Sequence, residues 1–392
     1  MTAFSFGPQR PLPFIDLSAQ QRRLGTRVHE AIARVLAHGQ YILGPEVHAL
    51  EAALAAFCGA KHAISCASGT DALALVLMAK GVKAGQAILC PSFTFAATAE
   101  VVAWLGATPV FVDVLPDTFN MDPASLARGL DTARRLGLDP VGVITVDLFG
   151  QPADYESLEP ICRAAGLWLL DDAAQAFGAV YRGRKIGTFG HATATSFFPA
   201  KPLGCYGDGG AIFTDDDALA AVIRSLRVHG EGADKYDNVR IGMNGRLDTI
   251  QAAVLIEKLK IFPEEIERRN AIAQRYSGGL AHVAAAVPTV REGCVSTWAQ
   301  YTIRLPAALR DKVAAALKAR GIPTAIYYRQ PLHRQPAYQR FPLAGNGLPH
   351  SEAAAREVLS LPMHAYLDAD VQDAIIAEIS DVIGKATCPA RA

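Results

Sequence analysis

Short β-prone runs alternate with helix-like stretches between residues 62 and 170, and this order constrains the fold more than any other feature of the sequence. The predicted strands are His62–Cys66, Ala87–Cys90, Pro109–Val114, Val141–Val146 and Leu167–Leu170. The predicted helices between them are Asp71–Lys80, Ala96–Leu105, Pro123–Leu130 and Asp154–Ala165. This repeated order predicts a mainly parallel sheet with helices on both faces, in which ligands bind beyond the carboxyl ends of the strands.

The flanking segments extend this plan at both ends. Apolar residues at helical spacing predict helices through Leu24, Val28, Ile32 and Val35 and through Val47, Leu50, Leu54 and Phe57. Further on, the sequence predicts strands at Ala192–Phe198, Gly210–Thr214 and Tyr301–Leu305, and helices at Leu247–Lys260, Pro263–Gly278 and Ala307–Arg320. We therefore expect a large domain over residues 16–262 and a smaller C-terminal α+β domain over residues 263–392.

The composition narrows the classes of function. The 392 residues are 51% hydrophobic and 19% charged, and 38 basic residues balance 38 acidic ones, so neither nucleic acid nor an anionic membrane is expected as a partner. The N-terminus lacks the pattern of a secretory signal, and Ala72–Ala79 is shorter than the roughly 20 apolar residues of a membrane span. The seven scattered cysteines have no metal-binding spacing. These features predict a cytoplasmic protein without a metal site.

Four segments carry residues that point to chemistry. The first is Ser68-Gly69-Thr70-Asp71, which lies between a predicted strand and a helix. Free N–H groups and the helix dipole make such a position an anion site, although an ordinary helix cap explains the same residues. The second is the run from Leu169 to Gln175, where Asp171 and Asp172 end an apolar strand. A buried carboxylate there needs a cation or hydrogen-bond donors, and a protonated pyridine nitrogen would serve; a helix cap is the alternative.

The third segment runs from Ser196 to Gly210 and contains Lys201 in a loop rich in glycine and proline. A lysine in a partly desolvated pocket has a lowered pKa and forms Schiff bases with aldehydes, whereas most lysines after a strand are solvated. The Gly207-Asp208-Gly209-Gly210 run opens a strand and lacks the spacing of a dinucleotide fingerprint, which argues against a nicotinamide oxidoreductase. The fourth segment, Gly242–Asp248, presents Asn244 and Arg246 from a loop, where they could bind phosphate or carboxylate.

In this order and spacing, the four segments resemble the DegT/DnrJ family of sugar-nucleotide aminotransferases. The resemblance runs from Gly39 to His364, and 29 positions separate Asp172 from Lys201. It implies a pyridoxal-phosphate (PLP) transferase fold of the aspartate-aminotransferase type, with a mainly parallel seven-stranded sheet. It also implies PLP, in its aldehyde and amine (PMP) forms, as cofactor and ping-pong transfer of an amino group from glutamate to a keto sugar.

The resemblance implies a role for each matching residue. Lys201 forms the Schiff base with PLP, Asp172 pairs with the pyridine nitrogen, and Gln175 lies near the ring hydroxyl. The residues implied to bind the cofactor phosphate are Gly69, Thr70 and Ser196. Phe95 is similar to the aromatic residue that stacks on the ring, with Phe93 as the rival for that role and core packing as the alternative for either.

The resemblance also implies a homodimer with shared active sites. Asn244 would reach the cofactor phosphate of the neighbouring subunit, and Arg246 would face the substrate across the interface. Within the family, the sequence is most similar to enzymes acting on UDP-2-acetamido-2-deoxy-3-oxo-glucuronate, which implies a part in surface polysaccharide and O-antigen synthesis. One departure is that Tyr327, before Tyr328 in the substrate loop, stands where histidine is common. His333 and His364 lie in similar loops and are expected to be structural histidines with satisfied ring nitrogens.

Two other functions stay open from the sequence. One is amination of a dTDP-linked keto-6-deoxysugar, which assays of both sugar nucleotides would distinguish. The other is a PLP-binding regulator without turnover, against which the complete set of Asp172, Gln175, Ser196 and Lys201 argues. A sister group that removes a sugar hydroxyl carries histidine in place of the PLP lysine, so Lys201 argues against that activity as well.

Overall fold

A computed structural model describes residues 12–387 of the chain. The N-terminal stretch on which the expected lack of a secretory signal depends lies mostly outside these residues, as does Cys388. The other six cysteines are free thiols. Among the described residues, we find no helix that combines the length and the apolar character needed to cross a bilayer.

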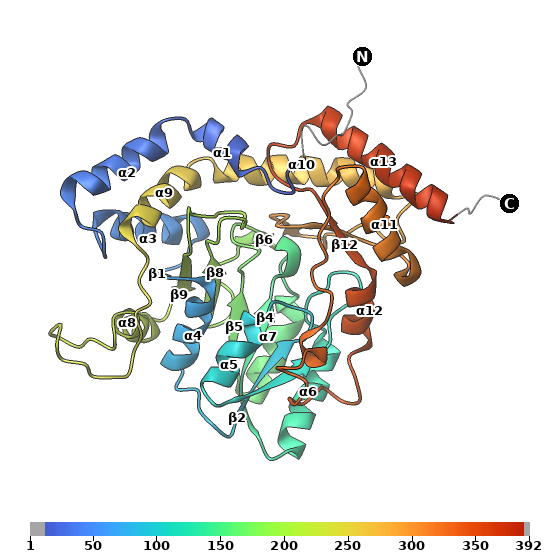
Figure 1. The fold of residues 1–392 in the computed structure, drawn as a ribbon. Helices are drawn as coiled ribbons and strands as arrows, with labels where there is room; N and C mark the ends of the chain where they lie inside the picture. The colour runs from blue at the N-terminus through green and yellow to red at the C-terminus, as the bar shows by residue number, and fades with distance from the viewer. Residues whose placement is uncertain (1–11, 388–392) are drawn as a thin grey trace.

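A seven-stranded sheet forms the centre of the molecule, with the strand order β1-β9-β8-β5-β4-β2-β3 (Figure 1). The strands are β1 His62–Cys66, β2 Gln86–Pro91, β3 Thr108–Val112, β4 Asp139–Val146, β5 Trp168–Asp172, β8 Ala192–Ser196 and β9 Gly210–Thr214. Strand β9 runs antiparallel to β1 and β8, whereas the other neighbouring pairs are parallel. The predicted α/β class and the mainly parallel sheet are therefore confirmed.

Helices cover both faces of this sheet, as the alternating sequence predicts. Helix α4 (Gly69–Ala79) contacts α5 (Ala97–Trp104) and α8 (Asp217–Leu226), while α6 (Pro123–Arg135) contacts α7 (Tyr155–Ala165). The connections through α4 (β1 to β2) and α5 (β2 to β3) lead towards the β3 edge of the sheet. Those through α6 (β3 to β4) and α7 (β4 to β5) lead back in the opposite direction. Right-handed crossovers therefore place the two pairs on opposite faces.

The N-terminal helices pack beside the sheet in a way that the sequence predicted only in part. These helices are α1 Leu17–Leu24, α2 Arg27–His38 and α3 Pro45–Cys58, and α9 Thr249–Leu259, from later in the chain, contacts α2 and α3. The apolar periodicity from Leu24 to Val35 predicted one helix, but the chain breaks at Gly25, whose φ of 62° is accessible mainly to glycine. Leu24 and Val28 still pack together against Val254 of α9.

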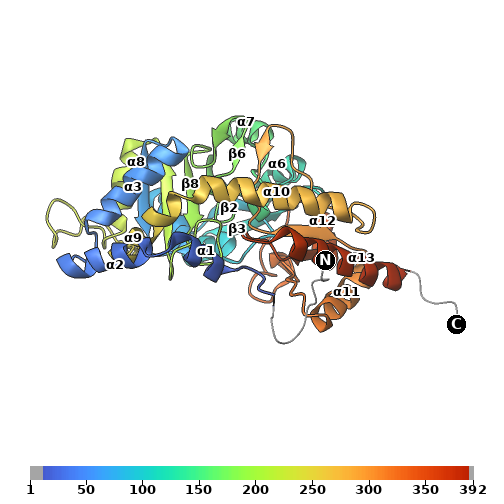
Figure 2. The same ribbon diagram turned by 90° about the horizontal axis from the view of Figure 1, so that it is seen from above.

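The C-terminal part has an apolar core of its own. It contains α10 Phe262–Leu280, α11 Ala307–Ala319, α12 Pro349–Glu357 and α13 Ala369–Thr387, together with β11 Tyr301–Arg304 paired antiparallel to β12 Val358–Leu361. Helix α10 runs from α9 across the molecule to lie beside α13 (Figures 1 and 2). The separate core around Tyr276, Tyr301 and Ile379 supports two domains, but the boundary at residues 262 and 263 stays a prediction.

A small sheet and two short turns complete the description. The three-stranded sheet pairs β6 (Val180–Tyr181) with β7 (Arg184–Lys185) and β10 (Cys294–Val295), and single 3-10 turns occur at Leu148–Gly150 and Leu332–Arg334. The β6–β10 pairing ties the large sheet's connection after β5 to the segment that leads into β11. The two apolar cores are therefore joined by main-chain hydrogen bonds as well as by α10.

Phe177 lies at the junction between the sheet and α10. Its ring stacks on Phe213 of β9 at 5.1 Å between centroids and on Phe262, the first residue of α10, at 6.1 Å. All three side chains are buried in one apolar cluster. Aromatic side chains bury more surface than other residues and gain further from ring contacts, so this stack fixes where α10 leaves the large sheet.

We expect Phe177→Ala to lower the free energy of unfolding by about 3–5 kcal/mol, because it removes a buried ring and leaves a cavity between Phe213 and Phe262. Chemical denaturation measures the change. The control is Trp104→Ala, since the Trp104 side chain is 62% exposed and its loss should change stability by only about 0.5 kcal/mol. Equal changes in the two variants would contradict this account of the stack.

Candidate active site

Residues from three predicted segments meet at the carboxyl ends of β1, β5 and β8. Asp172 ends β5 and pairs in register with Ala194 of β8, two residues before Ser196. Gly69 begins α4 so close to β8 that a Cβ atom on it would lie 2.6 Å from the Ser196 Cβ. The fold therefore brings Gly69, Thr70, Asp172 and Ser196 to one edge of the sheet, as the sequence predicted for ligand-binding residues.

The start of α4 has the features of an anion site. Ser68 caps the helix by accepting a hydrogen bond from the Asp71 N–H at 3.0 Å, so the ordinary capping role applies to Ser68 itself. The first N–H groups of a helix have no intrahelical acceptor, and the helix dipole makes this end positive. Gly69 and Thr70 occupy these first two positions beside Ser196. They are therefore placed to bind a phosphate.

Asp172 is a buried carboxylate with its own donors. One oxygen accepts from the Thr98 hydroxyl at 2.8 Å and the other from the Ala174 N–H at 3.2 Å. Burial raises its pKa, while these two hydrogen bonds and the charge of Lys201 oppose the rise. Thr98 was not singled out from the sequence, although a hydroxyl residue in the apolar start of α5 is the signal that could have identified it.

Lys201 lies in the loop between β8 and β9 and is half-buried. The main-chain N–H of Lys201 donates to the Phe198 carbonyl at 2.8 Å, and this hydrogen bond closes a turn directly after β8. Burial lowers the pKa of the Lys201 amine, and the Asp172 charge raises it in turn. An amine with a lowered pKa is more often neutral and therefore nucleophilic, as a covalent role requires.

Gln175 connects this edge to the C-terminal part of the chain. Its Oε1 accepts from the Phe149 N–H at 2.6 Å, and its Nε2 donates to the Tyr328 hydroxyl at 3.1 Å. Burial raises the pKa of Tyr328 further above its ordinary value, so the phenol stays protonated. Tyr327 contacts Tyr328 at 5.9 Å between ring centroids. Of the predicted substrate residues, Tyr328 thus contacts a predicted cofactor residue, and Tyr327 lies beside Tyr328.

The two candidate stacking residues differ in their surroundings. The Phe93 side chain is fully buried and packs with Phe119 in an apolar cluster, whereas 58% of Phe95 is exposed. Phe95 also lies 6.5 Å from Tyr328 between ring centroids. Phe95 is therefore the residue with a ring surface available to a ligand, while Phe93 belongs to the core.

Asn244 and Arg246 lie in a segment tied to the start of α4. The Gly245 carbonyl accepts from the Ala67 N–H at 3.1 Å, and the Gly245 N–H donates to the Arg227 carbonyl at 3.0 Å. Arg227 is itself fixed by a buried ion pair with Glu51 at 2.5 Å. Asn244 is exposed beside this anchor, and the Arg246 Nε is buried without a hydrogen-bond partner within residues 12–387. Arg246 is thus an unsatisfied donor in this region.

The two histidines expected to be structural differ from each other. His333 is buried, with Ser92 Oγ at 2.6 Å from one ring nitrogen and Glu352 at 3.2 Å from the other, as expected. For His364 the expectation of satisfied ring nitrogens is wrong, because it is buried and neither nitrogen has a partner in the described part of the chain. Burial and then the neighbouring Arg269 charge lower its pKa to about 4, so His364 is neutral.

Comparison with known proteins identifies the family. The model of the DegT/DnrJ/EryC1/StrS aminotransferase family matches residues 23–380. The chain belongs to this family. It is 48% identical over 357 residues to the UDP-2-acetamido-2-deoxy-3-oxo-D-glucuronate aminotransferase of Pseudomonas aeruginosa, covering 91% of this chain and 96% of that enzyme.

Two solved structures support the assignment. A DegT DnrJ EryC1 StrS aminotransferase from Brucella abortus superimposes with a TM-score of 0.93 at 51% identity, covering 95% of this chain and all 100% of that one. NtdA from Bacillus subtilis, solved with bound cofactor PMP, has a TM-score of 0.85 at 25% identity, with coverages of 97% and 87%. The expected family, the enzyme class and the fold are therefore confirmed.

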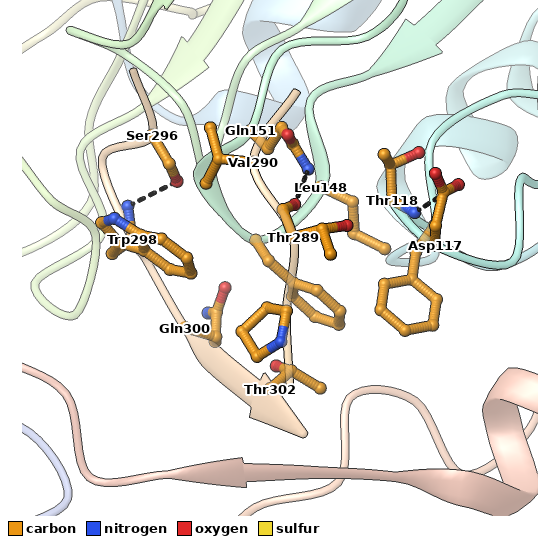
Figure 3. A pocket seen from close by; sticks show the side chains of 13 residues that line it. Asp117, Thr118, Leu148, Gln151, Thr289, Val290, Ser296, Trp298, Gln300 and Thr302 are labelled. Atoms are coloured by element: carbon orange, nitrogen blue, oxygen red, sulfur yellow. Dashed lines mark hydrogen bonds between the residues drawn. The ribbon is translucent and has the colours of Figure 1, made fainter. Parts of the chain in front are cut away.

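This aminotransferase also has a small cavity away from the predicted site. Its volume is about 20 Å³, it lies between residues 117–119, 148–151 and 288–302, and none of the predicted site residues lines it (Figure 3). Gln151 donates to the Thr289 carbonyl at 3.0 Å across it, whereas the buried Gln300 Oε1 has no partner within the described residues. Phe149 lines this cavity, and its main-chain N–H donates to Gln175 Oε1. No metal-binding cluster of His, Cys, Asp or Glu occurs within residues 12–387.

Two further carboxyls of this aminotransferase are buried behind Asp172. Asp147 follows β4 and accepts from the Ala153 N–H at 2.6 Å and the Tyr155 hydroxyl at 2.8 Å, all through one oxygen. Its other oxygen and both oxygens of Asp171 have no hydrogen-bond partner in the described chain. Burial raises the pKa of Asp147 to about 7. Burial, and after it the charge of Asp147, raises the pKa of Asp171, whereas the nearby Tyr155 hydroxyl lowers that pKa.

We expect Asp147→Asn to change how stability depends on pH. The folded-state pKa of Asp147 is above its unfolded value, so the folded protein binds more protons between about pH 4 and pH 7 and loses stability as the pH rises through this range. Asparagine keeps the acceptor for Ala153 and Tyr155 and removes the charge. Denaturation at pH 5 and pH 8 should show the variant more stable than the wild type at pH 8 by about 1–3 kcal/mol.

The matched control is Asp139→Asn, at the exposed beginning of the same strand. It should leave both the stability at pH 8 and its slope with pH unchanged. If Asp147→Asn and the wild type lose stability equally between pH 5 and pH 8, Asp147 does not carry the proton that its burial implies.

Proposed function

We propose that this aminotransferase uses PLP bound to Lys201 to convert UDP-2-acetamido-2-deoxy-3-oxo-glucuronate into the 3-amino sugar, with glutamate as amino donor. The observation that carries the proposal is the 48% identity to the Pseudomonas aeruginosa enzyme of that activity over 91% of the chain. The bound PMP of NtdA, a relative of the same fold, supports the choice of cofactor.

The residues at the sheet edge fit PLP on their own chemistry. Lys201 supplies a half-buried amine with a lowered pKa, and Asp172 supplies a buried carboxylate held by Thr98. The start of α4 beside Ser196 supplies unpaired N–H groups for a phosphate, and Phe95 supplies an exposed ring. A carbonyl, a basic ring nitrogen, a phosphate and an aromatic face are the groups that such a set would hold.

When bound, PLP withdraws electrons from the substrate carbon that gains or loses the amino group. Asp172 would support this by pairing with the ring nitrogen and holding a proton there, since its own carboxylate is fixed by Thr98 and Ala174. Gln175 is oriented by the Phe149 N–H so that its amide faces Tyr328, and it would lie near the ring hydroxyl. Gly69, Thr70 and Ser196 would bind the phosphate.

Lys201 has two tasks in this mechanism. Its Nζ would hold the cofactor, which would supply an electron sink for the donor carbon. As a free amine, Nζ would accept and hold the proton that leaves this carbon, which requires a pKa below that of a solvated lysine. Burial lowers the pKa of Lys201 in the required direction. Because donor and acceptor react in turn at one site, ping-pong kinetics follow.

Substrate recognition is assigned to Arg246, Tyr327 and Tyr328. A guanidinium pairs with a carboxylate through two parallel hydrogen bonds, which suits a sugar acid. The buried, unpaired Nε of Arg246 leaves a donor for such a group. Tyr328 is held by Gln175, and Tyr327 lies between Tyr328 and Phe14, so both phenols are fixed near the predicted cofactor position.

A homodimer with shared active sites is part of the proposal. Asn244 is exposed, and Ile241 nearby is 90% exposed, which is unfavourable for an apolar side chain in water. Other exposed large apolar residues are Leu36, Tyr41 and Ile42 in and after α2, Phe198 and Tyr206 between β8 and β9, and Tyr236 between α8 and α9. A second copy of the chain covering these residues would bring Asn244 to its neighbour's phosphate site.

The biological setting also stays a prediction. The resemblance implies a step in surface polysaccharide and O-antigen synthesis. A cytoplasmic location fits the six described cysteines, which are all free thiols, because disulfides are rare in a reducing compartment.

We expect Lys201→Ala to abolish both turnover and the visible absorbance of lysine-bound cofactor. Borohydride reduction followed by peptide mass spectrometry should mark Lys201 in the wild-type holoenzyme. The control Lys83→Ala removes an exposed lysine and should keep both properties. A Lys201→Ala variant with normal transamination, or a wild-type enzyme marked at another lysine, would refute the assignment of Lys201.

We expect the wild-type enzyme with glutamate to aminate the UDP-linked 3-oxo sugar acid in preference to a dTDP-linked 4-oxo-6-deoxysugar. The physical reason is that Arg246 would lose its carboxylate partner on the neutral deoxysugar and remain unpaired. Product analysis by mass spectrometry after incubation with each substrate measures the preference. Preferential amination of the deoxysugar would favour the dTDP-sugar alternative.

A further inference from the structure

A second lysine is buried beneath the loop that carries Lys201. Lys258 lies on the last turn of α9, and only 1% of it is exposed. Its Nζ donates to the Gly204 carbonyl at 2.6 Å and lies 4.3 Å from the centre of the Tyr206 ring. It forms no ion pair with any residue from 12 to 387. A buried ammonium without a carboxylate partner is costly, so its two contacts with this loop call for an explanation.

The loop from Phe197 to Gly209 is closed at its base. The Phe197 N–H donates to the Gly209 carbonyl and the Cys205 N–H to the Phe197 carbonyl, both at 2.7 Å. Gly204 packs directly against the turn before Lys201, since a Cβ on Gly204 would lie 2.6 Å from the carbonyl oxygens of both Phe198 and Pro199. A shift of Gly204 would therefore move the backbone that positions Lys201.

Helix α9 contacts this loop through two side chains, Lys258 and Gln251. Besides the contacts of Lys258, Gln251 accepts from the Tyr206 N–H at 2.8 Å and donates to the Tyr206 carbonyl at 3.2 Å. Gln251 and Lys258 are seven residues apart, which places them on one face of the helix two turns apart. The same helix begins three residues after Arg246. One rigid element thus holds the Lys201 loop next to the segment with the predicted substrate residue.

We propose that Lys258 is a positioning residue for Lys201, holding the Lys201 loop through the Gly204 carbonyl and the Tyr206 ring. This inference rests on the proposed function of Lys201. Lys258 contributes a charge-assisted hydrogen bond and a cation–π contact, and a buried ammonium makes both stronger than they are in water. Burial lowers the pKa of Lys258 to about 8, which agrees with an amine enclosed by the loop.

The test compares Lys258→Met, which keeps the length of the side chain without its charge, with Lys258→Arg, which keeps the charge. In PLP-loaded enzyme with glutamate and the 3-oxo sugar nucleotide, Lys258→Met should lower kcat by about 10- to 100-fold, since small displacements of reacting groups cost that much. The KM for glutamate should change by less than about threefold. Lys258→Arg should recover part of kcat.

Two controls separate positioning from loss of structure. Lys260→Met replaces an exposed lysine that directly follows α9, and it should leave kcat unchanged. Borohydride should still mark Lys201 in Lys258→Met, because the loop is present but displaced. If Lys258→Met does not fold, Tyr206→Leu decides the question once size-exclusion chromatography shows that it keeps the wild-type oligomeric state, since it removes the ring contact with Lys258. A reduced kcat then supports the inference and an unchanged kcat overturns it.

The failures of the two proposals are distinguishable. If wild-type Lys201 is not marked by borohydride, the proposed function fails, and this inference fails with it. If Lys201 is marked but Lys258→Met has the wild-type kcat, or Lys258→Arg is no more active than Lys258→Met, only the inference is overturned.

Discussion

The parallel pairing of β5 with β8 is the constraint on which the rest of the site depends. It sets Asp172 beside Ala194, and thereby places the carboxylate one strand away from the chain that continues through Ser196 to Lys201. The close approach of Gly69 to Ser196 then brings the start of α4 to the same edge. Because strand pairing is fixed by main-chain hydrogen bonds, the sheet sets the positions of the side chains proposed to bind the cofactor.

Several ionisable groups are buried around this edge, and they differ in the partners that offset the cost of burial. Asp172 is held by Thr98 and Ala174, and Arg227 by an ion pair with Glu51. Within residues 12–387, Asp147 and Asp171 have no ion-pair partner, so protonation is the way to avoid two buried negative charges. Lys258 likewise forms no ion pair with the described residues, and its amine contacts a carbonyl and a ring. Burial is therefore the largest cause of the shifted pKa values of Asp147, Asp171, Asp172 and Lys258.

The sequence predicted much of the site because its residues follow strands. Asp172 comes directly after the predicted strand Leu167–Leu170 and ends β5, and Ser196 lies near the end of the predicted strand Ala192–Phe198 and ends β8. Lys201 follows in a loop rich in glycine and proline, so the topology alone brings the three residues near each other. Other features could not be found this way. The roles of Thr98 and Lys258 depend on which helix faces pack against the loops, and the break at Gly25 interrupts an unbroken apolar period. The unsatisfied nitrogens of His364 likewise depend on neighbours distant in sequence.

By itself, the sequence determined the α/β class, the order of the strands along the chain and the residues able to carry amino-group chemistry, because periodicity and strand ends are local properties. Only the tertiary structure decided that Phe93 is buried and Phe95 exposed, and that Gln175 joins Tyr328 to the sheet edge. The same holds for the enclosure of Lys258 beneath the Lys201 loop. The physical reason is that exposure, hydrogen-bond partners and pKa depend on which distant segments pack together, and a local pattern does not contain that information.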